Sequence, residues 1–238
     1  MAERIRIQKA IANSGLMSRR AAEDAMRDGR VELNGRPVVL GDRVVPEHDI
    51  LTLDGHPVPV AEHLETYLLS KPVGVISTAS DPEGRRTVVD LIDSRRRLYP
   101  VGRLDSDSEG LILVSNDGEL TNRVTHPSFG VTKTYLAEVE GQVGRATIRR
   151  LATGIDLDDG PARAESARLV ESRPNRSLVE VVMVEGRNRE VRRMFDVVGH
   201  PVRRLVRTAI GGLTDQGLGP GDSRRLSAAE IQRVLVGR

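Results

Sequence analysis

Two short helices are predicted at the start of the chain. Apolar residues recur at spacings of three and four over residues 5–14, the period of an amphipathic helix, and Gly15 follows as a stop. Ser18 is a favourable N-cap for a second helix over residues 19–28. Gly29 stands where a left-handed C-terminal cap belongs.

A small sheet is predicted directly after these helices. Apolar and polar residues alternate over residues 31–33 and 37–39, and Asn34-Gly35 lies between the two runs. Asn-Gly in such a position is the strongest short-range signal for a β-hairpin. A further strand over residues 49–53 completes a block of two helices and a small sheet.

A linker is predicted over residues 54–63, which contain two prolines and show no helical period. We therefore divide the chain into domains over residues 1–60 and 61–238. From residue 67 onward, apolar runs typical of strands alternate with short helical patches, as in the apolar run over residues 178–184.

Composition excludes several classes of protein. The 238 residues include no cysteine and only 2% aromatic residues, so the core must consist mainly of Val, Leu and Ile. A chain without cysteine has no disulfide framework, thiolate nucleophile or Cys-based zinc site, and the five histidines show no metal-ligand spacing. No apolar run reaches the roughly 18 residues of a membrane span, and the N-terminus lacks the apolar core of a signal peptide. We expect a soluble cytoplasmic protein without a metal site.

Charge points to an anionic partner through its placement rather than its total. The net charge is only +2, but all except three of the 36 basic residues are arginines, whose planar guanidinium suits phosphate. Residues 1–36 hold eight cations against five acids. Arg19 and Arg20 lie in the first turn of a predicted helix, where the helix dipole disfavours cations. Either an anion docks there, or these residues form a solvated charged face.

The first block resembles an S4 domain, a small RNA-binding module. The likeness covers residues 15–55 and rests on the S-R-R, G-R-V and L-N-G triplets at the family spacing. The resemblance implies that this block grips structured RNA. It assigns phosphate contacts to four arginines: Arg19, Arg20, Arg30 and Arg36.

The sharpest segment of the second block is G-R-L-D, which ends at Asp105 and precedes a predicted strand over residues 111–114. An acid at the mouth of a loop between two buried strands is placed like a site residue. The acids after residue 104 imitate the start of a calcium-binding EF-hand loop. However, that loop needs ligands at its ninth and twelfth positions, where Leu113 and Asn116 stand here. No Walker A motif or dinucleotide-binding glycine motif is present.

The densest cationic region lies between Glu185 and Arg207, with seven arginines and three acids. A helix is predicted there with Asn188 as its cap, and Arg192 and Arg193 at the edge of its buried stripe. This region favours contact with RNA phosphates over a merely solvated helix face.

Lys133 and Tyr135 lie two residues apart in a predicted strand and therefore on the same face. A half-buried tyrosine in a strand is most often a packing residue, so the spacing leaves a catalytic role for Tyr135 open.

Taken together, these segments resemble the RsuA family of pseudouridine synthases, which isomerise uridine in ribosomal RNA. The matching motifs occur in family order from the N-terminus to about Gly212; they are Lys71-Pro72-x-Gly74, Gly102-Arg103-Leu104-Asp105, Lys133-x-Tyr135 and Asn188 to Met194. The resemblance implies an α+β protein, with an S4 domain of two helices and a small sheet. The larger catalytic domain is expected to hold a mainly antiparallel mixed sheet flanked by helices.

The resemblance also implies roles for individual residues. Asp105 is the essential carboxylate, Arg192 its ion-pair partner with Arg193 as the second choice, and Tyr135 stacks on the uracil. A cation beside a buried carboxylate keeps it ionised. The residues expected to hold RNA in this domain are Arg103, Lys133, Arg187, Arg189 and Arg193. The isomerisation needs neither a metal nor a redox cofactor, and the target nucleotide must flip out to reach Asp105.

Two other functions compete with this one. A non-catalytic RNA-binding or ribosome-assembly protein would need none of Asp105, Tyr135 and Arg192. An S4-bearing methyltransferase would need a glycine-rich loop for its methyl donor, and the sequence shows none. We expect a monomer that acts on ribosomal RNA or a ribosome precursor, with the large subunit favoured.

Overall fold

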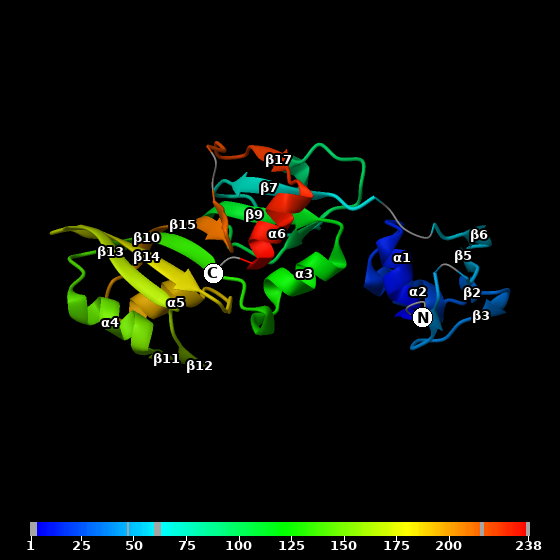
Figure 1. The fold of residues 1–238 in the computed structure, drawn as a ribbon, viewed down its shortest axis with the longest axis horizontal. Coiled ribbons are helices and arrows are strands. Elements are labelled where there is room, and N and C mark those ends of the chain that lie inside the picture. Colours follow the sequence, from blue (N-terminus) through cyan, green and yellow to red (C-terminus); the bar gives the residue numbers. More distant parts are fainter. Residues whose placement is uncertain (1–3, 47, 60–62, 215–216, 237–238) are drawn as a thin grey trace. The chain divides into compact units, whose positions relative to one another are not determined.

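The computed structural model describes residues 4–46, 48–59, 63–214 and 217–236 (Figure 1). The chain divides into two compact units. The first comprises the described residues up to Glu65 with Ser94–Arg97 and Asn116–Gly118, and the second comprises the rest. The predicted boundary between residues 60 and 61 lies outside the described residues. No helix in the described ranges is long and apolar enough to cross a membrane.

The first unit is built from two helices and short strands. In chain order they are β1 Ile5–Arg6, α1 Ile7–Asn13, α2 Arg19–Arg27, β2 Val31–Leu33, β3 Arg36–Pro37, β4 Arg43–Val44, β5 Leu51–Leu53 and β6 His56–Pro57. Strands β3, β2, β5 and β6 form one sheet in that order, and β1 pairs with β4. A hydrophobic cluster with Ile7, Ile11 and Met26 joins the helices to the sheet.

Local sequence chemistry explains most of these elements. The Ser18 hydroxyl accepts the Ala21 N–H at 3.1 Å and caps α2, and Gly29 ends it in the left-handed region at φ +70°. Asn34 and Gly35, at φ +53° and +75°, form the predicted hairpin turn between β2 and β3. These predictions are confirmed.

Two details of the first unit differ from the prediction. Helix α1 begins at Ile7 rather than at residue 5, because Ile5 and Arg6 pair with β4. The expected linker begins with a second hairpin, in which Asp54 and Gly55 adopt φ +52° and +77° between β5 and β6. Asp-Gly is a hairpin signal like Asn-Gly, and the proline content of the segment obscured it.

The second unit contains a nine-stranded sheet in its described part. Its elements are β7 Thr66–Lys71, η1 Val89–Leu91, β8 Tyr99–Val101, β9 Glu109–Ser115, α3 Gly118–Thr125, η2 Pro127–Phe129, β10 Lys133–Glu140, α4 Arg145–Thr153, β11 Ile155–Leu157, β12 Gly160–Ala162, β13 Ser166–Arg173, β14 Arg176–Met183, α5 Glu190–Val197, β15 Val202–Ile210, β16 Leu213–Thr214, β17 Ser223–Arg225 and α6 Ala228–Val236. The sheet order is β13-β14-β10-β15-β9-β7-β17, with β16 beside β15 and β8 beside β9. Only β15 and β9 pair in parallel among the described strands. The mainly antiparallel mixed sheet flanked by helices is confirmed.

Strand β9 is buried on both faces of this sheet. Ile112 and Val114 belong to the hydrophobic cluster that includes residues of α4 and α5. Leu111 and Leu113 belong to a second cluster that includes residues of α3 and α6. Successive strand residues face opposite sides, so helices cover both faces and the loop before β9 starts from a rigid base.

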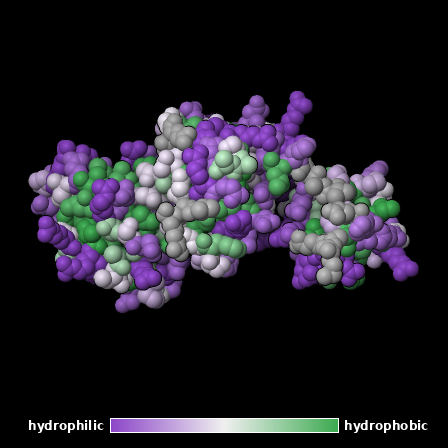
Figure 2. All heavy atoms as spheres, in the orientation of Figure 1, coloured by the Kyte–Doolittle hydropathy of each residue, from purple (hydrophilic) through white to green (hydrophobic). Residues whose placement is uncertain are grey.

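The surface is mixed in polarity. Figure 2 shows mainly hydrophilic residues on the visible face of each unit. Hydrophobic residues are interspersed among these hydrophilic ones, most visibly at the end of the large sheet that carries β13 and β14. Single exposed apolar side chains are normal on a folded protein.

Candidate active site

Asp105 lies in the loop that joins β8 to β9, as the sequence predicts. The Ser77 hydroxyl holds this loop through both backbone groups of Leu104: it accepts the N–H at 3.1 Å and donates to the carbonyl at 2.8 Å. Beyond the loop, Gly110 pairs with Arg207 across the parallel β9–β15 pair. A Cβ at Gly110 would lie 2.3 Å from the Arg207 carbonyl oxygen, so only glycine permits this close approach.

The Lys71 ammonium fixes the end of the same loop. Its Nζ donates to the carbonyl oxygens of Ser108 at 2.8 Å and Pro72 at 2.9 Å, and the residue is 1% exposed. Burial lowers the pKa of Lys71 to about 8, although Asp107 and Asp105 oppose the shift. The sequence motif includes this lysine without giving it a role. The signal in the sequence for a buried structural lysine is its position at the end of an apolar strand.

A cavity of about 360 Å³ opens beside Asp105. Asp105, Tyr135, Arg103 and Arg189 are among its lining residues. Asp105 and Arg189 also line an adjoining hollow of about 440 Å³. The Asp105 side chain is 27% exposed and can therefore reach a molecule in either space. Both volumes are in the range of small-molecule sites.

Among the described residues, Arg189 is the cation within ion-pair distance of Asp105, and its Nη1 lies 3.8 Å from Oδ2. The predicted pair between Asp105 and Arg192 is wrong. Arg192 is buried, and its Nη2 donates to the Asp107 carbonyl oxygen at 2.9 Å. Its inward position on α5 directs the guanidinium to backbone groups of the loop rather than to the Asp105 carboxylate. Arg193, the second choice, pairs with Asp159 at 2.9 Å.

Tyr135 on β10 is one of the lining residues of the cavity, and its side chain contacts Arg207. Sequence reasoning missed Arg207. Nη1 of Arg207 lies 3.4 Å from Tyr135 Oη, and the guanidinium carbon lies 5.9 Å from the ring centroid. Arg207 is 4% exposed, and its Nε donates to the Leu111 carbonyl oxygen. The sequence shows seven arginines between Glu185 and Arg207, but nothing in it indicates that Arg207 is buried.

Lys133 lies on the same strand, but its ammonium is engaged inside the protein. Nζ donates to the carbonyl oxygens of Val124 at 2.9 Å and Val131 at 2.8 Å. Burial lowers the pKa of Lys133 to about 8. Its expected contact with RNA stays a prediction, and its observed role is to tie α3 to β10.

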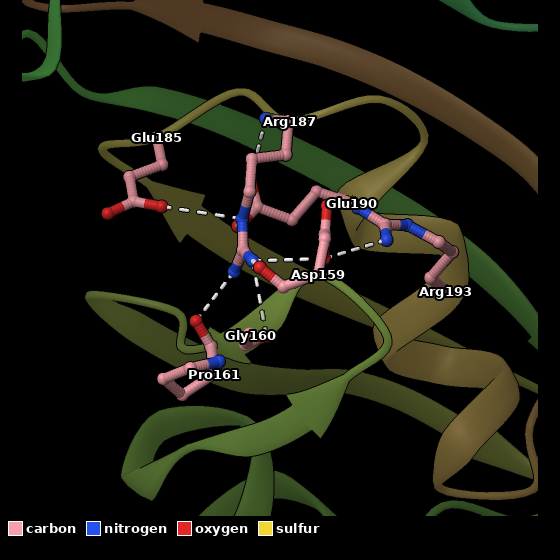
Figure 3. Close-up of polar contacts among 7 residues, drawn as sticks. All are labelled: Asp159, Gly160, Pro161, Glu185, Arg187, Glu190 and Arg193. Atoms are coloured by element: carbon pink, nitrogen blue, oxygen red, sulfur yellow. Dashed lines mark hydrogen bonds and ion pairs between the residues drawn. The ribbon is translucent and has the colours of Figure 1, made fainter.

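Arg187 and Arg193 bind the β11–β12 hairpin (Figure 3). Arg187 donates to Asp159 Oδ1 at 3.0 Å and to the Pro161 carbonyl oxygen at 2.7 Å, while Arg193 contacts both Asp159 oxygens. The backbone N–H of Arg187 donates to Glu190 Oε2 at 3.0 Å. These arginines therefore fix the loop over residues 184–189, which forms one wall of the cavity.

The helix after this loop begins differently from the prediction. Arg189, not Asn188, occupies the N-cap of α5, in the left-handed region at φ +48° and without a side-chain cap. Such a backbone conformation is strained for a residue other than glycine. It carries the Arg189 side chain to the loop that contains Asp105.

The four arginines predicted to hold RNA in the first unit differ in their ion pairing. Arg19, Arg20 and Arg36 are exposed. Arg30 is also exposed, but it forms a two-pronged pair with Asp54 at 2.8 and 2.5 Å and lowers the pKa of that carboxyl. Arg19 and Arg20, in the first turn of α2, are exposed and accessible to a phosphate.

Comparison with known proteins shows the family to which the chain belongs. The family model for RNA pseudouridylate synthase matches residues 65–196, and the model for the S4 domain matches residues 5–50. An RNA pseudouridine synthase of Mycobacterium leprae is 45% identical over 235 residues, covering 97% of this chain and 92% of the relative. The ribosomal large subunit pseudouridine synthase B of Bacillus subtilis is 40% identical, covering 96% of this chain and 95% of the relative.

A solved structure described as a pseudouridylate synthase matches with a TM-score of 0.69 and 29% identity, covering 97% of this chain and 99% of that one. The match extends over both the S4 unit and the unit with the cavity. The chain belongs to the RNA pseudouridylate synthase family and carries an S4 domain at its N-terminal side.

Proposed function

We propose that this enzyme isomerises one specific uridine of large-subunit ribosomal RNA, with Asp105 as the essential carboxylate. The observation that carries the role of Asp105 is its place: the carboxylate lies at the junction of two cavities and beside a guanidinium. The relative named for the large ribosomal subunit supports the choice of RNA, because it is similar along nearly the whole chain.

The reaction requires a carboxylate that faces an extruded nucleotide. The N-glycosidic bond of the uridine breaks, the uracil turns, and a bond to carbon forms in its place. A carboxylate can attack the sugar, add to the base, or assist elimination to a glycal. Each route begins with the Asp105 carboxylate next to the nucleotide, and the Arg189 guanidinium lies 3.8 Å from that carboxylate.

Other residues around the cavity support the same chemistry. Tyr135 supplies a flat ring on which the uracil can stack and, once it has lost its own proton, a phenolate oxygen that can accept the proton released from carbon. Arg103 is exposed at the wall and suits a phosphate or a displaced base. We propose that the enzyme acts as a monomer.

Pseudouridine mapping in a strain that lacks the gene tests this function. We expect one uridine of the large-subunit RNA to remain unmodified, and the purified protein to convert that uridine in an RNA transcript. Loss of a modification in small-subunit RNA would overturn the choice of substrate. No lost modification, together with a defect in ribosome assembly, would indicate a non-catalytic RNA-binding role.

A further inference from the structure

Asp107, two residues after Asp105, accepts hydrogen bonds from the nearby arginines. Arg189 Nη1 lies 3.2 Å from Asp107 Oδ1, and Nη2 lies 3.0 Å from Oδ2. Arg192 Nη2 is 3.5 Å from the same carboxylate. A two-pronged contact between guanidinium and carboxylate is among the strongest side-chain hydrogen bonds. Asp107 is therefore the preferred partner of Arg189.

Asp105 remains close to that charge without being bound by it. Its Oδ2 lies 3.8 Å from Arg189 Nη1, which is an ion contact but too long for a hydrogen bond. Within the described ranges, no side chain donates a hydrogen bond to the Asp105 carboxylate. Its lone pairs are free while a positive charge lies beside it.

We propose that Asp107 is a positioning residue that keeps Arg189 from binding Asp105 directly. The inference rests on the proposed role of Asp105. A carboxylate needs free lone pairs to attack a sugar or a base, and a guanidinium bound to it in two places would occupy them. By binding Arg189 itself, Asp107 leaves the lone pairs of the Asp105 carboxylate unobstructed.

Arg189 is the cation that moves if Asp107 loses its charge. Its side chain is 44% exposed, and the only carboxylates within ion-pair distance of it are Asp107 and Asp105 among the described residues. Arg192 stays in place because it is buried and also donates to the Val202 carbonyl oxygen at 3.2 Å and to Ser108. In Asp107→Asn, the remaining anionic partner of Arg189 is Asp105, less than 1 Å beyond hydrogen-bond distance.

A double-mutant cycle tests this inference. Tritium release from RNA labelled at the uracil carbon is followed in a single turnover at saturating RNA for the wild type, Asp107→Asn, Arg189→Ala and the double variant. We expect Asp107→Asn to lower the rate constant about tenfold or more, with an RNA affinity within about threefold of the wild type. In the Arg189→Ala background the same change should cost less than about threefold, because no guanidinium is left to move.

Two further variants sharpen the experiment. Asp107→Glu keeps the carboxylate and should retain most of the rate. Glu109→Gln is the matched control, since Glu109 is near in sequence but pairs with Arg204 at 2.7 Å, and its rate should remain near that of the wild type. An equal loss from Asp107→Asn in both backgrounds, or no loss at all, would overturn the inference.

Asp105→Asn in the same assay separates the two proposals. If Asp105→Asn is inactive and the cycle is additive, the role of Asp107 fails while that of Asp105 stands. If Asp105→Asn turns over RNA at the wild-type rate, the proposed function fails and the inference fails with it.

Discussion

The guanidinium of Arg207 donates to the hydroxyl of Tyr135 across 3.4 Å and lies against its ring. Arg207 reaches Tyr135 from β15, the strand next to β10, and its Nη1 also approaches the Arg103 carbonyl oxygen at 3.4 Å. One buried cation thus joins the strand that carries Tyr135 to the loop that carries Asp105. The relative position of the phenol and the carboxylate is built into the sheet.

Tyr135→Phe separates the ring from the hydroxyl. The phenylalanine ring can still stack on uracil and contact Arg207, so we expect RNA affinity to change little. If the Tyr135 phenolate accepts the proton from carbon, the single-turnover rate of tritium release should fall about 100-fold or more in this variant. Tyr67→Phe is a suitable control because Tyr67 packs against the hydrophobic cluster of the sheet. A rate for Tyr135→Phe within about threefold of the wild type would show that the hydroxyl takes no part.

Replacement of both Arg19 and Arg20 by alanine should weaken RNA binding and flatten its salt dependence. Each lost phosphate contact lowers the slope of log affinity against log salt by roughly 0.7 to 0.9, so a decrease between about 1 and 2 is expected. Fluorescence anisotropy over a salt series measures this slope. Arg27→Ala on the same helix is the control, because Arg27 is paired with Asp24. An unchanged slope in the double variant would mean that neither arginine touches phosphate.

Lys71, which is buried, and Lys133, which is half-buried, should make stability rise with pH. The pKa values of Lys71 and Lys133 fall from 10.5 to about 8 on folding. Between these values the unfolded chain holds a proton that the folded chain has released, so the free energy of unfolding increases with pH. Below pH 8 both states are protonated and this contribution is constant.

Lys71→Met and Lys133→Met should each remove part of this rise. In urea denaturation, the difference in free energy of unfolding between the wild type and either variant should be flat from pH 6 to 7.5 and grow toward pH 9.5, as expected for a pKa of about 8. A difference that stays constant through pH 9.5 would show that folding does not shift these pKa values.

Structural features that depend only on residues close together in the sequence, such as helix caps, were predictable. Ser18 caps α2 and Gly29 ends it because their local conformation requires those residue types. The Ser227 N–H donates to the Glu230 carboxylate at 2.9 Å at the start of α6, and the sequence pattern Ser-x-x-Glu is the signal for this capping box. The motif around Asp105 also predicted a loop between two strands correctly, although only β9 is buried along its length while β8 is mostly half-buried.

Partners distant in the sequence were not predictable in the same way. Arg189 and Asp107 are 82 residues apart, and their contact depends on the left-handed turn before α5 and on the loop before β9. Arg192 follows Arg189 by three residues, yet only the packing of α5 decides that it binds loop backbone instead of Asp105. The sequence marks a cationic region, whereas the fold determines which cation reaches which carboxylate.

The identity of the essential carboxylate is tested most directly by Asp105→Asn. Asparagine has nearly the same size and keeps the loop bonds that Ser77 and Lys71 make to its neighbours. We predict no detectable tritium release from RNA labelled at the uracil carbon, with RNA affinity within about threefold of the wild type. Isomerisation by this variant at a rate near that of the wild type would contradict the account.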